Sequence, residues 1–279
     1  MRLGSWGAHL APRAVADFLA ACADAGVCDV DLANIYGDST TNRLVGAAFA
    51  LRPELRARLR LIAKVGIVLA EAGSSGPGDY RYDSSVAGLQ RAIAASFTDL
   101  GVERIDVLML HRMDFLTSAT QLAELLQPML TDGRIGAFGV SNATPLQVDL
   151  LASQLPVSAH QFELSVMQSC ALFDGTHAHS QRHGFDIMAW SPLGGGAALD
   201  PQAVSSPQWQ PTLVRLCDEH GLTPAQLLLR WVHSVPGTRA VLGTQRIERV
   251  IEACHAAAQP LPHTDWYALL EAARGVRLP

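Results

Sequence analysis

Residues 12–32 read PRAVADFLAACADAGVCDVDL and join a helix to a strand within one short stretch. From Val15 to Cys22 the apolar side chains recur three and four positions apart, which is the period of a helix with one buried face. Pro12 lies near the expected start of this helix and Gly26 lies just past its end, as helix termini favour. A short run of strand length follows at once, so this stretch is one helix–strand unit.

The same unit recurs along the chain. Later helical patterns stop at Gly101 and at Asp132-Gly133, and Thr223-Pro224-Ala225-Gln226 has the form of a capping box that opens another helix. Between the helices we predict eight strands, which are Leu3 to Trp6, Val27 to Leu32, Leu61 to Lys64, Asp106 to Leu110, Ala137 to Val140, Ala159 to Gln161, Asp186 to Ala189 and Ala240 to Leu242. Alternating strands and helices are typical of an α/β protein with a parallel sheet.

A (β/α)8 TIM barrel is the fold that this pattern favours. Its usual length of about 250 residues is close to that of this chain, and we found no Ser/Gly/Pro-rich linker, so we expect a single domain over residues 1–279. The most biased segment, Glu71 to Ser85, is expected to be a βα loop over the barrel mouth. The alternative is an open doubly wound sheet, which is less favoured because no G-x-G-x-x-G follows the first strand.

Composition narrows the possible partners. The formal net charge of -5 argues against a nucleic-acid partner, which would favour a basic patch or stripe. Five cysteines without a C-x-x-C spacing indicate neither a disulfide framework nor a thiolate metal site. We find neither a secretory signal nor an uncharged apolar run long enough to span a membrane. We therefore expect a cytoplasmic protein that acts on a small molecule and binds neither membrane nor nucleic acid.

Three successive strands each end in an ionisable residue. Asp31 ends the second strand, Lys64 the third and His111 the fourth, and Tyr36 follows in the loop after Asp31. The active site of a (β/α)8 barrel lies at the carboxyl ends of its strands, so these four side chains are expected to converge. Asp31 and Lys64 lie on neighbouring strands and are expected to form an ion pair.

This set of side chains suits carbonyl reduction. A hydride that reaches the carbonyl carbon leaves negative charge on the oxygen, which Tyr36 would neutralise as a general acid. A phenol has a pKa of about 10, and the Lys64 ammonium, held by Asp31, is expected to lower that pKa. His111 would donate a hydrogen bond to the substrate oxygen. Each residue alone also has a structural explanation, such as a loop cap or a core histidine, so the ordered set is the specific signal.

Several motifs together resemble the aldo-keto reductase family, in its bacterial NADPH-dependent branch. They are VDLA at 30–33, IYG at 35–37, AK at 63–64, LHR at 110–112, FGVSN at 138–142, HQFE at 160–163, AWSPLG at 189–194 and LGTQR at 242–246. The resemblance covers roughly Leu3 to Cys254. It implies a TIM barrel that is an NADP-dependent enzyme, reducing aldehydes or ketones to alcohols with Asp31, Tyr36, Lys64 and His111 as its tetrad.

The resemblance also implies which residues contact NADPH/NADP. Around the nicotinamide they would be Ser141, Asn142, Gln161 and Trp190. Those bordering the pyrophosphate would be Ser191, Leu193, Gly194, Gly195 and Gly196. Around the adenosine 2′-phosphate they would be Gly243, Thr244, Gln245 and Arg246, with Glu252 near the adenine. Trp6, Met113, Phe115 and the segment Glu71 to Ser85 are expected to shape the substrate pocket.

Two other functions remain possible from the sequence. His177, His179 and His183 have a spacing that could hold zinc, as in a metal-dependent hydrolase on the same barrel. The usual barrel hydrolases, however, carry this motif after the first strand, so we predict no metal site. The second possibility is a regulatory subunit that keeps the reductase fold and the nucleotide without catalysis. It is less favoured because all four positions of the tetrad are filled.

Overall fold

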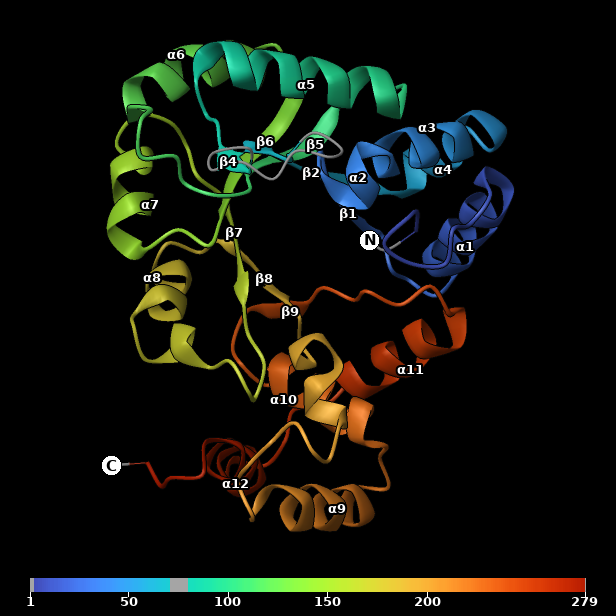
Figure 1. Cartoon of the computed structure of the whole chain (residues 1–279), viewed down its shortest axis with the longest axis vertical. Coiled ribbons are helices and arrows are strands. Elements are labelled where there is room, and N and C mark those ends of the chain that lie inside the picture. The colour runs from blue at the N-terminus through green and yellow to red at the C-terminus, as the bar shows by residue number, and fades with distance from the viewer. Residues whose placement is uncertain (1–2, 71–79, 279) are drawn as a thin grey trace. The chain divides into compact units, whose positions relative to one another are not determined.

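A computed structural model describes residues 3–70 and 80–278 of the chain. It divides into two compact units, which are coloured along the chain in Figure 1. The first unit takes in the chain up to His160 together with Gly243–Ile247, and the second takes in Gln161–Leu242 and the chain from Glu248 onward. Each unit is described by itself, and the expectation of a single domain stays a prediction.

The first unit is built on parallel strands. Its sheet contains β1 (Asp29–Ala33), β2 (Arg60–Val65), β5 (Ile105–Leu110) and β6 (Ile135–Ser141) in that order. Its helices are α1 (Pro12–Asp24), α2 (Tyr36–Ser39), α3 (Thr41–Leu51), α4 (Leu55–Arg58), α5 (Val86–Leu100), α6 (Ala119–Thr131) and α7 (Pro145–Ala152). The register pairs Asp31 with Ile62 and Ala33 with Lys64, so the ends of β1 and β2 lie side by side.

Helices α5 and α6 begin where the sequence provides capping side chains. Ser85 accepts a hydrogen bond from the backbone of Gly88 at the start of α5, and Ser118 and Gln121 form a capping box at the start of α6. Figure 1 shows α5 and α6 side by side across the outer side of β5 and β6. The predicted helix from Pro12 is confirmed as α1.

The predicted first strand is wrong. Leu3 to Trp6 leads into a turn in which Gly7 N donates to Gly4 O at 3.0 Å, and the loop closes where Leu10 N donates to Leu3 O at 3.0 Å. Leu3 is buried in the core of the first unit, which explains why the run looked like a strand. The glycines at either end of this short run favour a turn instead.

A small hairpin follows β2. It pairs β3 (Ile67–Val68) with β4 (Arg81–Tyr82) in antiparallel fashion. Of the segment Glu71 to Ser85, which we expected to be a loop over the barrel mouth, residues 71–79 lie outside the described part of the chain. The described remainder includes β4, which the sequence pattern did not predict.

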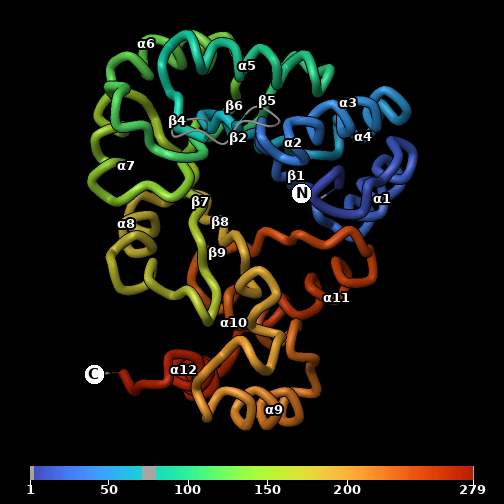
Figure 2. Tube along the Cα trace, in the orientation of Figure 1, coloured from blue at the N-terminus to red at the C-terminus, as the bar shows by residue number. Residues whose placement is uncertain are grey.

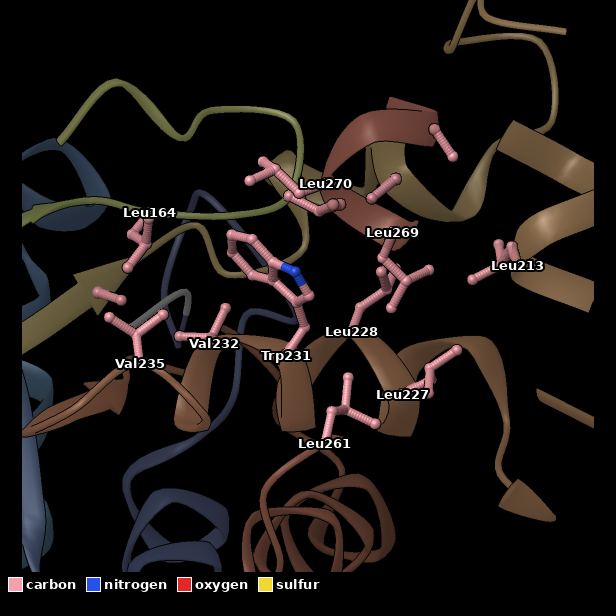
Figure 3. Close-up of a cluster of buried hydrophobic side chains, with 14 of the residues drawn as sticks. Leu164, Leu213, Leu227, Leu228, Trp231, Val232, Val235, Leu261, Leu269 and Leu270 are labelled. Carbon is pink, nitrogen blue, oxygen red and sulfur yellow. The ribbon is translucent and has the colours of Figure 1, made fainter. Parts of the chain in front are cut away.

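The second unit is centred on a tryptophan-rich core. β7 (Ala159–Glu163) begins in the first unit and ends in the second. The further elements are α8 (Thr176–Arg182), β8 (Asp186–Trp190), α9 (Trp209–His220), α10 (Pro224–His233), β9 (Thr238–Ala240), α11 (Ile247–Ala257) and α12 (His263–Arg274), with short 3-10 turns at Cys170–Leu172 and Gly194–Leu199. Figure 3 shows Trp231 of α10 among leucines and valines, and Trp266 stacks on its ring, so Trp231 is fully buried. The predicted capping box at Thr223 is confirmed.

The strands follow one another in chain order. Hydrogen-bonded neighbours run β1-β2-β5-β6-β7-β8-β9, and the pairs β1–β2, β2–β5, β5–β6 and β8–β9 are parallel. A doubly wound sheet reverses its strand order at a switch point, and this order contains no reversal. The course of the chain can be followed in Figure 2. Among the described residues, no helix combines the length and the apolar character that crossing a bilayer requires.

Candidate active site

Asp31 and Lys64 form the buried centre of the site. Lys64 Nζ lies 2.5 Å from Asp31 Oδ1, and the ion pair expected from the sequence is therefore present. Lys64 is 0% exposed and Asp31 is 9% exposed. Lys64 is also the only lysine in the sequence. Because an unpaired buried charge is costly, each member of the pair needs the other.

A left-handed turn holds Tyr36 next to this ion pair. Tyr36 opens α2, and the next three residues, Gly37, Asp38 and Ser39, have φ angles of 58°, 52° and 64°. A side chain on Gly37 would lie 2.6 Å from Thr41 Oγ1, so both the conformation and the space call for glycine there. The half-buried Tyr36 ring has its centre 5.0 Å from Lys64 Nζ.

The pKa of Tyr36 departs from the expectation. Burial raises the pKa of the Tyr36 phenol above its ordinary value of 10.0, and the nearby Lys64 ammonium, which lowers that pKa, does not outweigh burial. The Asp31 carboxylate adds to the upward shift. The sequence-based prediction of a lowered pKa was therefore wrong in its net direction, although the effect of Lys64 has the predicted sign. Tyr36 is a protonated phenol at neutral pH.

His111 completes the group as a neutral imidazole. It directly follows β5, and its backbone N donates to Val65 O at 2.8 Å. Its ring meets the Tyr36 ring edge-on, with the ring centres 5.9 Å apart. Burial, together with the positive charges of Lys64 and Arg112, lowers the pKa of His111 to about 3. Among the described residues His111 Nδ1 has no hydrogen-bond partner. The structure thus brings all four predicted tetrad side chains together.

Trp6 and Asp38 border the phenol on its outer side. The Trp6 ring centre lies 6.0 Å from that of Tyr36, which supports its expected place at the substrate pocket. Trp6 Nε1 donates to Asp38 Oδ1 at 2.9 Å. The sequence prediction missed Asp38, because a Gly-Asp pair after a strand signals only a turn. Of the other residues expected at the pocket, Met113 is half-buried and Phe115 is 83% exposed.

The first unit also holds part of the predicted nucleotide-binding set. Ser141 ends β6 and is buried, and Asn142 Nδ2 donates to Ser141 Oγ at 2.6 Å. Asn142 has a φ of 55°, a strained conformation that is common at functional sites. The segment Gly243–Ile247 belongs to the same unit, and there the backbone N of Arg246 donates to Thr244 Oγ1 at 3.2 Å. Gln245 is half-buried and the Arg246 side chain is exposed.

The second unit holds the rest of that set. Half-buried Trp190 ends β8, and Ser191 follows with a left-handed φ of 51°. Half-buried Leu193 leads into the run Gly194-Gly195-Gly196, whose φ values of 59°, 68° and 106° are ones that side chains disfavour. Gln161 is buried in β7 with its Nε2 3.9 Å from Met188 Sδ, and Glu252 is exposed on α11.

The histidines of the alternative metal site do not act as one group. His177 Nε2 lies 3.0 Å from Pro236 O, so this imidazole binds the main chain. His179 and His183 lie one helical turn apart with ring centres separated by 4.5 Å, and the His183 ring also stacks on Phe185. Of the three histidines that the sequence spacing suggested as one group, only His179 and His183 lie next to each other.

Comparison with known proteins gives one consistent result. A sequence profile described as the aldo/keto reductase family matches residues 1–274. A 6-dehydroglucose reductase of Novosphingobium aromaticivorans is 32% identical over 277 residues, covering 96% of this chain and 88% of that protein. The uncharacterized oxidoreductase YcsN of Bacillus subtilis is 30% identical over 262 residues, covering 92% and 87%.

Solved structures agree on the fold. An aldo/keto reductase from Klebsiella pneumoniae in complex with NADP and acetate matches with a TM-score of 0.75 and 24% identity, covering 96% of this chain and 87% of that one. A second structure of an aldo-keto reductase from the same organism, in complex with NADPH, also gives a TM-score of 0.75, at 23% identity. The predicted (β/α)8 barrel fold is confirmed.

Proposed function

The chain belongs to the aldo/keto reductase family of oxidoreductases, and on that basis we propose that it reduces aldehyde or ketone carbonyls to alcohols with NADPH. The observation that carries this proposal is the convergence of Tyr36, Lys64, Asp31 and His111 in one unit of the structure. A regulatory subunit without catalysis would not need a protonated phenol beside a buried ammonium. We further infer a cytoplasmic enzyme acting on small molecules.

Each of the four tetrad residues has its own role in this proposal. When bound, NADPH would be the source of the hydride for the carbonyl carbon. The Tyr36 hydroxyl donates its proton to the carbonyl oxygen, and the Lys64 ammonium stabilises the phenolate left behind. Asp31 holds Lys64 in place through the 2.5 Å contact. Neutral His111 donates a hydrogen bond to the same oxygen and so orients the carbonyl.

The predicted nucleotide-binding residues suit an anionic dinucleotide. The Gly194-Gly195-Gly196 run carries no side chains, so phosphate oxygens can approach its backbone closely, although Gly194 N and Gly196 N already donate to Ser191 O and Leu193 O. In the first unit, the groups proposed to meet a nicotinamide are the hydroxyl of Ser141 and the amide of Asn142. In the second unit, they are the amide of Gln161 and the aromatic face of Trp190. Because Lys64, the only lysine, is engaged by Asp31, arginines are the permanently charged side chains left to meet phosphate charges. We propose that Arg246 meets the adenosine 2′-phosphate.

Arg246→Ala should weaken NADPH binding far more than NADH binding. Arg246 directly precedes α11, whose amide dipoles also favour an anion. Loss of one charge-assisted hydrogen bond to phosphate corresponds to roughly ten- to a hundredfold in affinity. NADH lacks this phosphate, so its affinity should change little. Dissociation constants from tryptophan fluorescence quenching measure both.

Arg91→Ala is the matched control, because Arg91 is an exposed arginine of α5 and has no proposed contact with the nucleotide. Arg249 lies one turn further along α11 and can compensate in part, so the variant lacking both Arg246 and Arg249 is the stricter test. Equal weakening of NADPH and NADH by Arg246→Ala would place this side chain outside the phosphate site.

Reduction should be nearly independent of pH across the neutral range and should fall only in strongly alkaline solution. The reason is that Tyr36 acts as a protonated phenol, and burial raises its pKa above 10.0. His111, with a pKa of about 3, keeps one neutral form throughout this range. The measurement is kcat/KM for one aldehyde at saturating NADPH. A rise or fall of kcat/KM near neutral pH would contradict the protonation states assigned to Tyr36 and His111.

A carbonyl screen tests the proposed function itself. Purified protein is mixed with NADPH and a panel of aliphatic aldehydes, aromatic aldehydes, ketones and sugar carbonyls, and the loss of NADPH absorbance is followed. We expect turnover of at least one class. Nucleotide binding without turnover of any carbonyl would favour the regulatory-subunit alternative.

A further inference from the structure

One carboxylate binds the tip of the N-terminal loop. Ser5 Oγ donates to Asp38 Oδ2 at 2.8 Å, and Trp6 Nε1 donates to Asp38 Oδ1 at 2.9 Å, so each carboxylate oxygen receives one hydrogen bond. The hydrogen bond from Trp6 and, to a smaller extent, that from Ser5 lower the pKa of the Asp38 carboxyl below 3.8. Asp38 is therefore a carboxylate at neutral pH. It lies two residues beyond Tyr36.

The backbone at Asp38 is strained. Asp38 and Ser39 have φ angles of 52° and 64°, which is unfavourable for residues with a side chain. Such conformations persist only where surrounding contacts hold them, and they concentrate at functional sites. Aspartate and asparagine tolerate them better than most residues do. The hydrogen bonds to Asp38 thus fix a turn that begins at the proposed general acid.

The N-terminal loop has a fixed base as well as a fixed tip. Its base is the fully buried Leu3, whose carbonyl accepts a hydrogen bond from Leu10 N at 3.0 Å. Its tip carries Trp6, which is 42% exposed and has its ring 6.0 Å from the ring of Tyr36. The side chains at the tip are held by the two hydrogen bonds to Asp38, and within the loop Gly7 N donates to Gly4 O at 3.0 Å.

We propose that Asp38 is a positioning residue that holds Trp6 as a fixed apolar wall beside the Tyr36 phenol. The indole has a single donor, Nε1–H, and Asp38 already occupies it. The indole therefore has only its apolar ring to offer a substrate. This arrangement favours carbonyl substrates that carry an aromatic or other apolar group next to the reacting carbon. The substrate preference rests on the proposed function, whereas the hydrogen bond itself does not.

Kinetics with two aldehydes test the substrate preference. In Asp38→Gly, which keeps the left-handed backbone without strain, KM for benzaldehyde should rise about three- to tenfold, the size expected for losing one or two exposed hydrogen bonds. KM for propanal should rise less, and kcat should fall less than KM rises. Asp38→Asn should give an intermediate effect, because an amide has one acceptor oxygen. An unchanged ratio of kcat/KM between the two aldehydes would overturn the proposal.

Two further variants separate positioning from a general structural effect. Asp24→Ala removes an exposed carboxylate that pairs with Arg58 in the same unit, and it should leave the aldehyde preference unchanged. Trp6→Phe keeps an aromatic ring but loses the N–H donor. If Asp38 acts through Trp6, adding Asp38→Gly to Trp6→Phe should cause little further change. Additive losses in that double variant would exclude action through Trp6.

A spectroscopic measurement tests the clamp without activity. In proton–nitrogen correlation spectra the Trp6 indole signal is identified by its disappearance in Trp6→Phe. Asp38→Gly should shift this signal and speed its exchange with water, while Asp24→Ala should not. An unmoved signal overturns the clamp whatever the kinetics show. Conversely, parent protein that reduces no carbonyl refutes the proposed function, and the indole signal still decides whether Asp38 holds Trp6.

Discussion

Tyr36→Phe should abolish most carbonyl reduction and leave NADPH binding nearly unchanged. The substitution removes one hydroxyl while the ring keeps its contacts with His111 and Trp6. Among the described residues, Tyr36 is the phenol that lies beside the Lys64 ammonium. General acid catalysis contributes about a hundred- to ten-thousandfold, so the loss in kcat should fall in this range. Single-turnover rates and nucleotide dissociation constants measure the two properties separately.

Tyr267→Phe is the matched control, since it removes a phenol hydroxyl from a half-exposed tyrosine of α12. We expect its turnover to equal that of the parent. Near-normal turnover in Tyr36→Phe, with an unchanged circular dichroism spectrum, would remove Tyr36 from the role of general acid.

Lys64→Met should lower both activity and stability. The side chain keeps its bulk, but Asp31 is left as a buried charge without its cation. Breaking a buried ion pair in this way costs about 3–5 kcal/mol of unfolding free energy. The ammonium also lowers the pKa of Tyr36, so its loss should raise that pKa further and make the phenol a weaker acid. The alkaline limb of the pH–rate profile should then move to higher pH.

The pH dependence of the stability loss has a definite sign. Burial alone would lower the pKa of Lys64, but the Asp31 carboxylate, joined in alkaline solution by the Tyr36 phenolate, outweighs burial and raises the pKa above 10.5. The ion pair therefore contributes fully below the pKa of an unfolded lysine, and its contribution disappears as pH rises through the folded value. Urea unfolding of parent and variant should differ most at neutral pH and least in strong alkali.

A double variant separates the two effects of Lys64. Adding Asp31→Asn to Lys64→Met removes the uncompensated charge, so stability should partly recover while activity stays low. Superimposable pH–rate profiles of Lys64→Met and the parent would show that the ammonium does not act on the phenol.

The sequence predicts the site largely because strand ends are visible in it. Asp31 and Lys64 were predicted to end their strands, but β1 continues to Ala33 and β2 to Val65, and only His111 directly follows its strand. Polar residues close to the ends of apolar runs were still enough to indicate one edge of a parallel sheet. The prediction of a first strand at Leu3 to Trp6 was wrong, although it rested on the same signal, a short apolar run, as the strands that were predicted correctly. Leu3 is as apolar and buried as a strand residue, but glycines on either side of Ser5-Trp6 turn the backbone.

The sequence could not predict properties that depend on the balance of opposing effects, such as the net pKa of Tyr36. The sign of the Lys64 effect on Tyr36 follows from charge alone, whereas the net pKa depends on how deeply the phenol is buried. Asp38 shows a second kind of difficulty. Its partners Ser5 and Trp6 are more than thirty positions away in the sequence, and only the fold brings them into hydrogen-bond distance.

The seclusion of Lys64 has a practical consequence for chemical labelling. With no other lysine in 279 residues, an amine-reactive acylating reagent finds no accessible lysine in this sequence as long as the protein stays folded. Acylation of Lys64 requires the surrounding strands to open. The fraction of protein acylated at Lys64, measured by mass spectrometry, would therefore report how often these strands open. Fluorophores and cross-linkers directed at lysine side chains would therefore leave this sequence unlabelled while it is folded.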